Sequence, residues 1–97
     1  MHVISKRKLR EFRSVHHDAE TPLDRWFDIA EEADWQSFED IRAEFGRRAD
    51  RYGKFLIFDI GGNRYRLIVA AHFNRGILYV RHVLTHAEYD DGDWKEE

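Results

Sequence analysis

The sequence predicts an α+β domain, in which helices cover one face of a small antiparallel sheet. Two turn signals, Gly61-Gly62-Asn63 and Asn74-Arg75-Gly76, divide the second half of the chain into three apolar runs rich in β-branched and aromatic residues. The first half instead carries apolar residues at helical spacing. A length of 97 residues with 42% apolar side chains suits one domain, residues 1–97. Because there is no cysteine, a disulfide framework and a thiolate metal site are excluded.

The N-terminal part predicts a short strand followed by two helices. Residues 2–4 form an apolar start that suits an added strand. Ser5 is a candidate N-cap for a helix to about His16, because apolar residues recur at intervals of three. Thr21-Pro22-Leu23-Asp24 predicts the next start, with Thr as N-cap and Pro at the first helical position. That second helix runs to about Ala33.

A third helix and the remaining connections follow from turn and capping residues. Ser37 begins a capping-box pattern, and Gly46 is a natural stop. Residues 47–53 are polar and basic, which predicts a loop. After the last strand the acidic residues 90–93 end regular structure, and Trp94 is expected to dock back on the domain because the tail is otherwise polar.

The strand register decides which side chains share a face. Arg64 and Arg66 are two residues apart, so on a strand they project from the same side. A two-residue hairpin loop would put Asp59 opposite Arg64. A three-residue loop would shift the face by one residue and bring Lys54 to the arginines instead. Both registers are compatible with the sequence.

The charge is unevenly distributed along the chain. The total is −3, but residues 1–45 carry seven Lys/Arg against eleven Asp/Glu, residues 46–86 eight against two, and residues 87–97 one against six. The middle segment therefore has a net charge of +6 between segments of −4 and −5. A basic field of this kind acts locally, because charges more than about 8 Å apart are largely screened at physiological salt.

Several kinds of chemistry are poorly supported. No serine lies in a Gly-x-Ser-x-Gly elbow, and Gly61-Gly62 does not precede a helix, which argues against a phosphate loop. His16-His17 and His82-x3-His86 are the only histidine pairs with ligand-like spacing. In a strand the second pair would lie about 13 Å apart, too far to share an ion. We therefore expect no metal and no cofactor.

The start lacks an apolar signal segment, and no run approaches the about 20 apolar residues of a membrane helix, so a cytoplasmic protein is expected.

The basic strands suit RNA. Cleavage by attack of the 2′-hydroxyl needs a base, an acid and cations that hold the phosphorane-like transition state. Arginine binds two phosphate oxygens with its planar fork, histidine and tyrosine can transfer protons, and aromatic rings stack on unpaired bases. The candidates are Lys54, Arg64, Arg66, His72, Arg75, Arg81, His86 and Tyr89. The alternative is a non-catalytic domain that binds RNA or a protein through the same sheet.

Two motifs bring a family resemblance. FDIGGNRYRLIV and LYVRHVLTHAEYDDGDW resemble the HigB toxins of type II toxin–antitoxin modules, whose hallmarks are a Phe-Asn-Ile-x-Gly-Asn-basic-Tyr-Arg-Leu run and a Thr-His-Ala-Glu-Tyr-Asp close. The resemblance implies a RelE-like fold and an mRNA endonuclease that acts on the translating ribosome, in the 30S A site. It also implies inhibition by a HigA-type helix-turn-helix antitoxin in a hetero-oligomer.

The resemblance also implies roles for particular residues. Arg66 matches the phosphate-binding arginine, and Lys54, Arg64 and Arg81 match basic positions of the family. His86 is the candidate general acid, and Tyr89 would stack on a base or orient the nucleophile, with Lys54 or Tyr89 as the base. The further RNA contacts expected are His72, Arg75, Arg81 and Lys95. Two departures matter: Asp59 stands where the family usually has Asn, and the total charge of −3 is acidic whereas such toxins tend to be basic.

Overall fold

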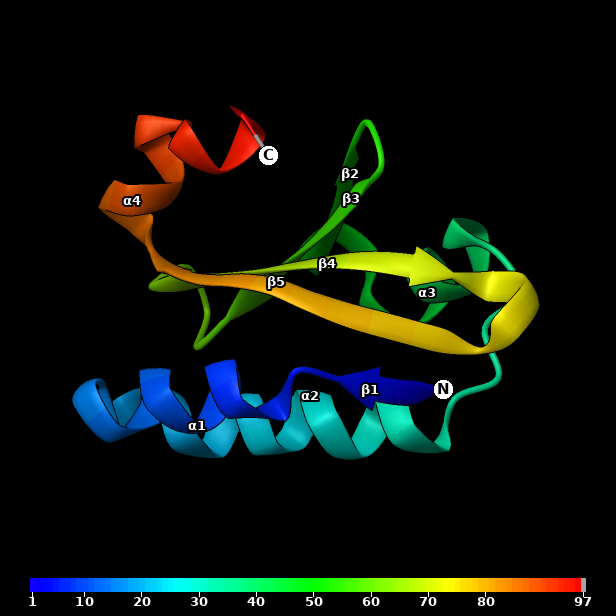
Figure 1. The fold of residues 1–97 in the computed structure, drawn as a ribbon, viewed down its shortest axis with the longest axis horizontal. Helices are drawn as coiled ribbons and strands as arrows, with labels where there is room; N and C mark the ends of the chain where they lie inside the picture. The colour runs from blue at the N-terminus through cyan, green and yellow to red at the C-terminus, as the bar shows by residue number, and fades with distance from the viewer. Residues whose placement is uncertain (97) are drawn as a thin grey trace.

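The computed structural model describes residues 1–96. Five strands form one mixed sheet in the order β1-β5-β4-β3-β2, in which β1 is parallel to β5 and all other pairs are antiparallel (Figure 1). The α+β architecture is as predicted. The elements are β1 (His2–Ile4), α1 (Lys6–Val15), α2 (Glu20–Glu32), α3 (Phe38–Phe45), β2 (Ala49–Tyr52), β3 (Phe55–Ile60), β4 (Tyr65–His72), β5 (Ile77–Thr85) and α4 (His86–Asp91).

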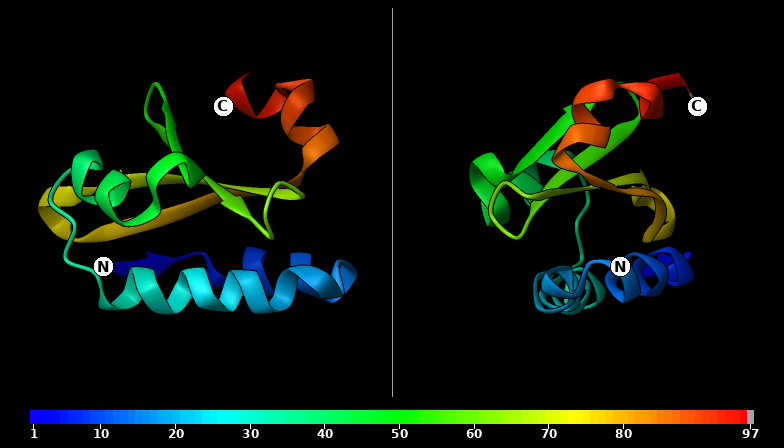
Figure 2. Two further views of the ribbon diagram at one scale, coloured as in Figure 1. Left: turned by 180° about the vertical axis from the view of Figure 1, so that it is seen from behind. Right: turned by 90° about the vertical axis from the view of Figure 1, so that its left-hand side faces the viewer.

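The main core lies between the sheet and the first three helices. α1 and α2 run side by side along one face of the sheet, as Figure 2 shows from two further directions. Alternate residues of β3 and β4 face them, so Phe58 and Leu67 are fully buried against α2 residues such as Leu23 and Trp26. We call this the helix face of the sheet.

The opposite face carries a second, smaller apolar cluster. Phe55, Ile57 and Ile68 alternate with the residues of the helix face and pack against Trp94. α4 and the following turn lie over this outer face (Figure 1). Trp94 is 4% exposed, which confirms that the acidic tail docks back on the domain.

Two predictions about the sheet were wrong. The expected loop at residues 47–53 contains β2, an edge strand paired with β3 in which only Ala49 is buried. Three exposed residues in a row hide the strand period from the sequence. The β3–β4 hairpin has neither expected register: Ile60 pairs with Tyr65, so the loop is Gly61–Arg64. Gly61 and Gly62 both have positive φ, of 63° and 71°, which allows this longer turn.

The helices differ from prediction mainly at their ends. α2 begins at Glu20, directly after a 3₁₀ turn at residues 17–19, so Thr21 lies inside the helix and does not cap it. Pro22 is accommodated because the N–H groups of the first helical turn have no hydrogen-bond partner within the helix, so proline removes no such bond. After β5 the chain continues into a helix: residues 86–91 form α4, and a Thr85–Glu88 capping box stabilises its N-terminus. That box was missed in the sequence.

Candidate active site on the outer face

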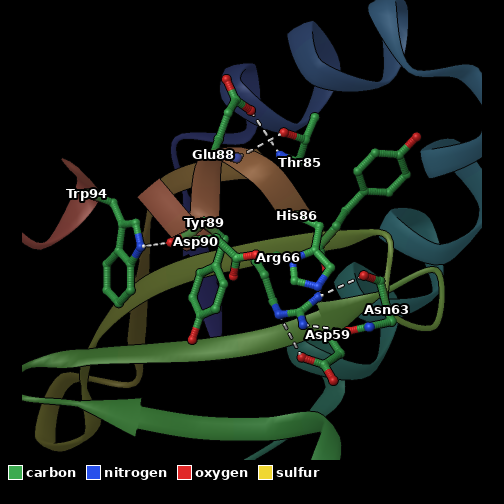
Figure 3. A network of polar contacts seen from close by, with 10 residues as sticks. Asp59, Asn63, Arg66, Thr85, His86, Glu88, Tyr89, Asp90 and Trp94 are labelled. Atoms are coloured by element: carbon green, nitrogen blue, oxygen red, sulfur yellow. Dashed lines mark hydrogen bonds and ion pairs between the residues drawn. The ribbon is translucent and has the colours of Figure 1, made fainter. Parts of the chain in front are cut away.

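The site is organised around the guanidinium of Arg66. This side chain lies on the outer face, and Arg66 is 8% exposed, the only charged residue among the buried ones that the structure describes. Its Nε is 3.2 Å from Oδ1 of Asp59, and its Nη1 donates to the carbonyls of Asn63 and Tyr65, each at 3.2 Å. Its Nη2 donates to Oδ1 of Asn63 at 2.5 Å. Figure 3 shows the fork held between Asp59 and the turn.

The local fold explains this arrangement. With the observed register Asp59 is directly opposite Arg66, so the two side chains share a face and meet as a cross-strand pair. The four-residue turn places Asn63 next to the Arg66 guanidinium, from which it accepts hydrogen bonds. Nη2 keeps a second N–H for which residues 1–96 supply no hydrogen bond. The guanidinium is therefore held by Asp59 and the turn, and one of its N–H groups has no partner among these residues.

His86 and Tyr89 are brought to Arg66 by the start of α4. The His86 backbone N–H donates to the Arg64 carbonyl at 3.0 Å, which fixes the first turn of the helix next to β4. The Tyr89 ring centre is 5.1 Å from the Arg66 guanidinium, a cation–π contact. The capping box stabilises this turn, because the Glu88 N–H donates to Thr85 Oγ1 and the Thr85 N–H to the Glu88 carboxylate. Figure 3 shows the His86 and Tyr89 rings beside the guanidinium.

His86 has a carboxylate partner. Its Nδ1 is 3.1 Å from Oδ2 of Asp90, one helical turn away. That distance is an ion-pair separation, but the same Nδ1 is buried and makes no aligned hydrogen bond. The Asp90 carboxylate therefore lies beside the His86 ring without a directed hydrogen bond.

Burial sets the proton affinities of the two acids at Arg66. Burial raises the pKa of Asp59 above its ordinary value, an effect that the Arg66 charge opposes. Burial likewise raises the pKa of the Tyr89 phenol, again against the influence of Arg66. The phenol therefore stays protonated near neutral pH, which suits stacking or hydrogen-bond donation and not proton abstraction.

The structure separates two expected partners from Arg66. Arg64 belongs to the turn and not to the strand, so the expectation that it shares a side with Arg66 was wrong. Its Nη1 is 2.5 Å from Oδ2 of Asp18, beside the helix face. Lys54 lies at the β2–β3 turn, about 16 Å along the strand from Asp59 at 3.3 Å per residue. Neither residue reaches the guanidinium.

The remaining candidates lie apart from Arg66. His72 ends β4, about 20 Å along the strand from Arg66, and Arg75 lies in the turn that follows. Arg81 is exposed at an irregularity of the β4–β5 pairing, where its guanidinium lies 5.7 Å from the Tyr79 ring centre. Lys95 lies in the tail beside Trp94. Only Arg66, His86 and Tyr89 converge.

Two residues of the site were missed in the sequence. Asn63 anchors Arg66, and Asp90 accompanies His86. The Asn63 contact depends on a four-residue loop, which is longer than both the two-residue and the three-residue loop expected from the sequence. The Asp90 contact could have been found, because residues four apart meet on a helix once α4 is recognised.

Within residues 1–96, no three histidine or acidic side chains are grouped closely enough to hold a metal ion. No helix of that part is long and apolar enough to cross a membrane.

Comparison with known proteins supports the family resemblance. Residues 19–92 match the family model described as HigB toxin, RelE-like toxic component of a toxin–antitoxin system. Over 92 residues the chain is 30% identical to the mRNA interferase HigB of Escherichia coli O6:H1 (strain CFT073), which covers 93% of this chain and 89% of that protein. It is 27% identical to the mRNA interferase toxin HigB of Escherichia coli K12, over 93% of this chain and 88% of that protein. Since the family model spans most of the chain and carries the motifs around Arg66 and His86, the chain belongs to the HigB toxin family of RelE-like toxins.

Proposed function

We propose that this protein is an mRNA endonuclease, the toxin of a toxin–antitoxin module, that cleaves mRNA on the ribosome without a metal. The convergence of Arg66, His86 and Tyr89 on one face carries the proposal. It supplies a cation, an imidazole and an aromatic ring, which are the parts that RNA cleavage by 2′-hydroxyl attack uses.

In this mechanism Arg66 binds the scissile phosphate. The 2′-oxygen attacks phosphorus while its proton leaves to a base, and the bond to the 5′-oxygen breaks as that oxygen takes up a proton. His86 is the proposed acid for the leaving oxygen, with Asp90 beside its Nδ1. Tyr89 packs against Arg66 and keeps its guanidinium in place beside the substrate base.

The ribosome and the antitoxin complete the proposal. The names of the relatives describe them as mRNA interferases and toxins. We infer a substrate mRNA in the 30S A site, in the cytoplasm, and a HigA-type helix-turn-helix antitoxin that covers the outer face or blocks binding to the ribosome. A short helix-turn-helix reading frame next to this gene would support the partner.

The test is expression without antitoxin, followed by mapping of mRNA 5′ ends. We expect wild type to stop growth and to produce new 5′ ends in translated mRNA. Arg66→Gln and His86→Gln should lower cleavage by about 10²–10⁴-fold, the usual contribution of such a group. Matched controls are Arg10→Gln and His17→Gln, exposed residues on the helix side of the molecule.

The outcomes are separable. If wild type leaves mRNA intact and growth normal, the domain is a binding module and not an enzyme. If wild type cleaves and both site variants cleave equally well, the enzyme remains but the site lies elsewhere. Thermal melting of each purified variant identifies loss of folding, which matters for the buried Arg66.

A further inference from the structure

A row of aromatic rings leads away from Arg66 across the outer face. Tyr89 contacts the guanidinium and stacks on Trp94, with ring centres 5.4 Å apart and planes 11° apart. Trp94 in turn meets Tyr52 at 5.6 Å and Phe55 at 5.9 Å, both edge to face. The row thus joins the proposed phosphate site to the β2–β3 hairpin by successive contacts.

The outer end of the row is exposed. Tyr52 is 48% exposed, and among residues 1–96 only it and Val15 are large apolar side chains with this degree of exposure. Trp94 is buried beneath it. Tyr52 therefore presents ring surface to solvent on a rigid aromatic base, at the edge strand of the sheet.

Two ammonium groups flank the exposed end. Nζ of Lys95 is 4.7 Å from the Tyr52 ring centre and 5.6 Å from that of Trp94. Nζ of Lys54 is 5.3 Å from the Phe55 ring centre. Aromatic rings with cations beside them, along one surface, are the arrangement by which proteins hold single-stranded nucleic acid: bases stack on the rings and phosphates meet the cations.

We propose that Tyr52, with Lys95 and Lys54, forms a binding site for an unpaired nucleotide of the RNA strand that flanks the phosphate held by Arg66. The base stacks on Tyr52, and the ammonium groups neutralise the neighbouring phosphates. The proposal rests on the proposed function and deepens it, because it extends the substrate contact from one phosphate to a stretch of single strand.

The test measures binding of a fluorescent single-stranded RNA oligonucleotide with 2′-O-methyl groups, which removes the nucleophile. We expect Tyr52→Ala to weaken binding by about 5- to 150-fold, the effect of losing one stacked base. Tyr52→Phe keeps the ring and should bind within about 2-fold of wild type. Val15→Ala, the other exposed apolar side chain, serves as control.

Salt dependence separates the roles of ring and cations. The slope of log affinity against log salt should fall by about 0.7 in Lys95→Ala or Lys54→Ala, because each loses one phosphate contact to a single strand. In Tyr52→Ala the slope should stay as in wild type. Melting curves confirm that each variant is folded.

The inference is overturned if Tyr52→Ala binds the oligonucleotide like wild type, or if wild type does not bind it. If Tyr52→Ala instead weakens only the complex with the antitoxin, the face binds protein and not RNA. In each case the proposed function is judged separately, by whether wild type cleaves mRNA in cells.

Discussion

Asp59→Asn is the substitution that best probes the candidate site. Asp59 pairs with Arg66 across the sheet and is 3.2 Å from its Nε, so part of the cation's field is already neutralised before any phosphate arrives. Asparagine has nearly the same shape and keeps an oxygen for Nε. We therefore expect the variant to bind RNA more tightly than wild type.

The size of the effect follows from the geometry. A phosphate on the far edge of the guanidinium would lie about 6 Å from the Asp59 carboxylate, where two unit charges repel by roughly 0.7–1.4 kcal/mol at an effective dielectric constant of about 40–80. The Asp59 side chain is 30% exposed, which justifies these high values. Removing the repulsion should tighten binding by about 3- to 10-fold. Since burial raises the pKa of Asp59 despite Arg66, folding disfavours its charge on balance, and the melting temperature should not fall.

The assay is oligonucleotide affinity at two or more salt concentrations, with cleavage in a translating extract as a second readout. Asp28→Asn is the matched control, because it changes the net charge equally from an exposed position on α2. The gain should shrink as salt rises. Equal or weaker binding by Asp59→Asn, with Asp28→Asn unchanged, would refute the idea that Arg66 binds phosphate against Asp59.

Three further predictions concern pH, the α4 cap and the core. The hydrogen bond from Tyr65 lowers the pKa of Asp18 below 3.8 and raises the pKa of Tyr65 above 10.0. The stability advantage of wild type over Tyr65→Phe should thus be full between these pH values. This advantage should be lost as pH falls below about 3.8, because Asp18 of the folded protein then becomes protonated. It should also be lost as pH rises above about 10, because Tyr65 ionises first in the unfolded chain. Urea titrations at several pH values check both limits. Thr85→Ala removes the capping box and should cost about 0.5–2 kcal/mol in urea unfolding and reduce cleavage, whereas Glu88→Gln keeps the box and should do neither strongly. Phe58→Ala empties a fully buried position and should cost about 3–5 kcal/mol, and a loss under 1 kcal/mol would contradict the assigned core.

The fold was more predictable than the site. Turn residues, apolar runs and helical spacing identify four strands and three helices, because each of these elements carries a clear apolar or turn signal. β2 was not predicted, because an edge strand with a single buried residue shows no alternation of apolar and polar residues in the sequence. α4 was not predicted, because its packing depends on Trp94 of the tail and its own residues show no apolar spacing typical of a helix.

The site depended on a quantity that the sequence does not contain, the length of one turn. Both considered registers kept Arg64 near the strand, and the observed one moves it to Asp18 and sets Asp59 against Arg66. A single residue of loop length thus changes which acid meets which base. His86 and Tyr89 could be anticipated because they lie in the family motif, but their orientation toward Arg66 needed α4.

The pairing of β1 with β5 also sets the order in which the protein can become complete during synthesis. His2 aligns with Ile77, so the first strand made has no partner until some 75 further residues have been added. At typical elongation rates of about 5–20 residues per second, that strand waits about 4–15 s. Arg66, His86 and Trp94 also follow late in the chain. A nascent chain therefore offers an unpaired strand to chaperones for several seconds, and it assembles the outer face only after Trp94 has been added.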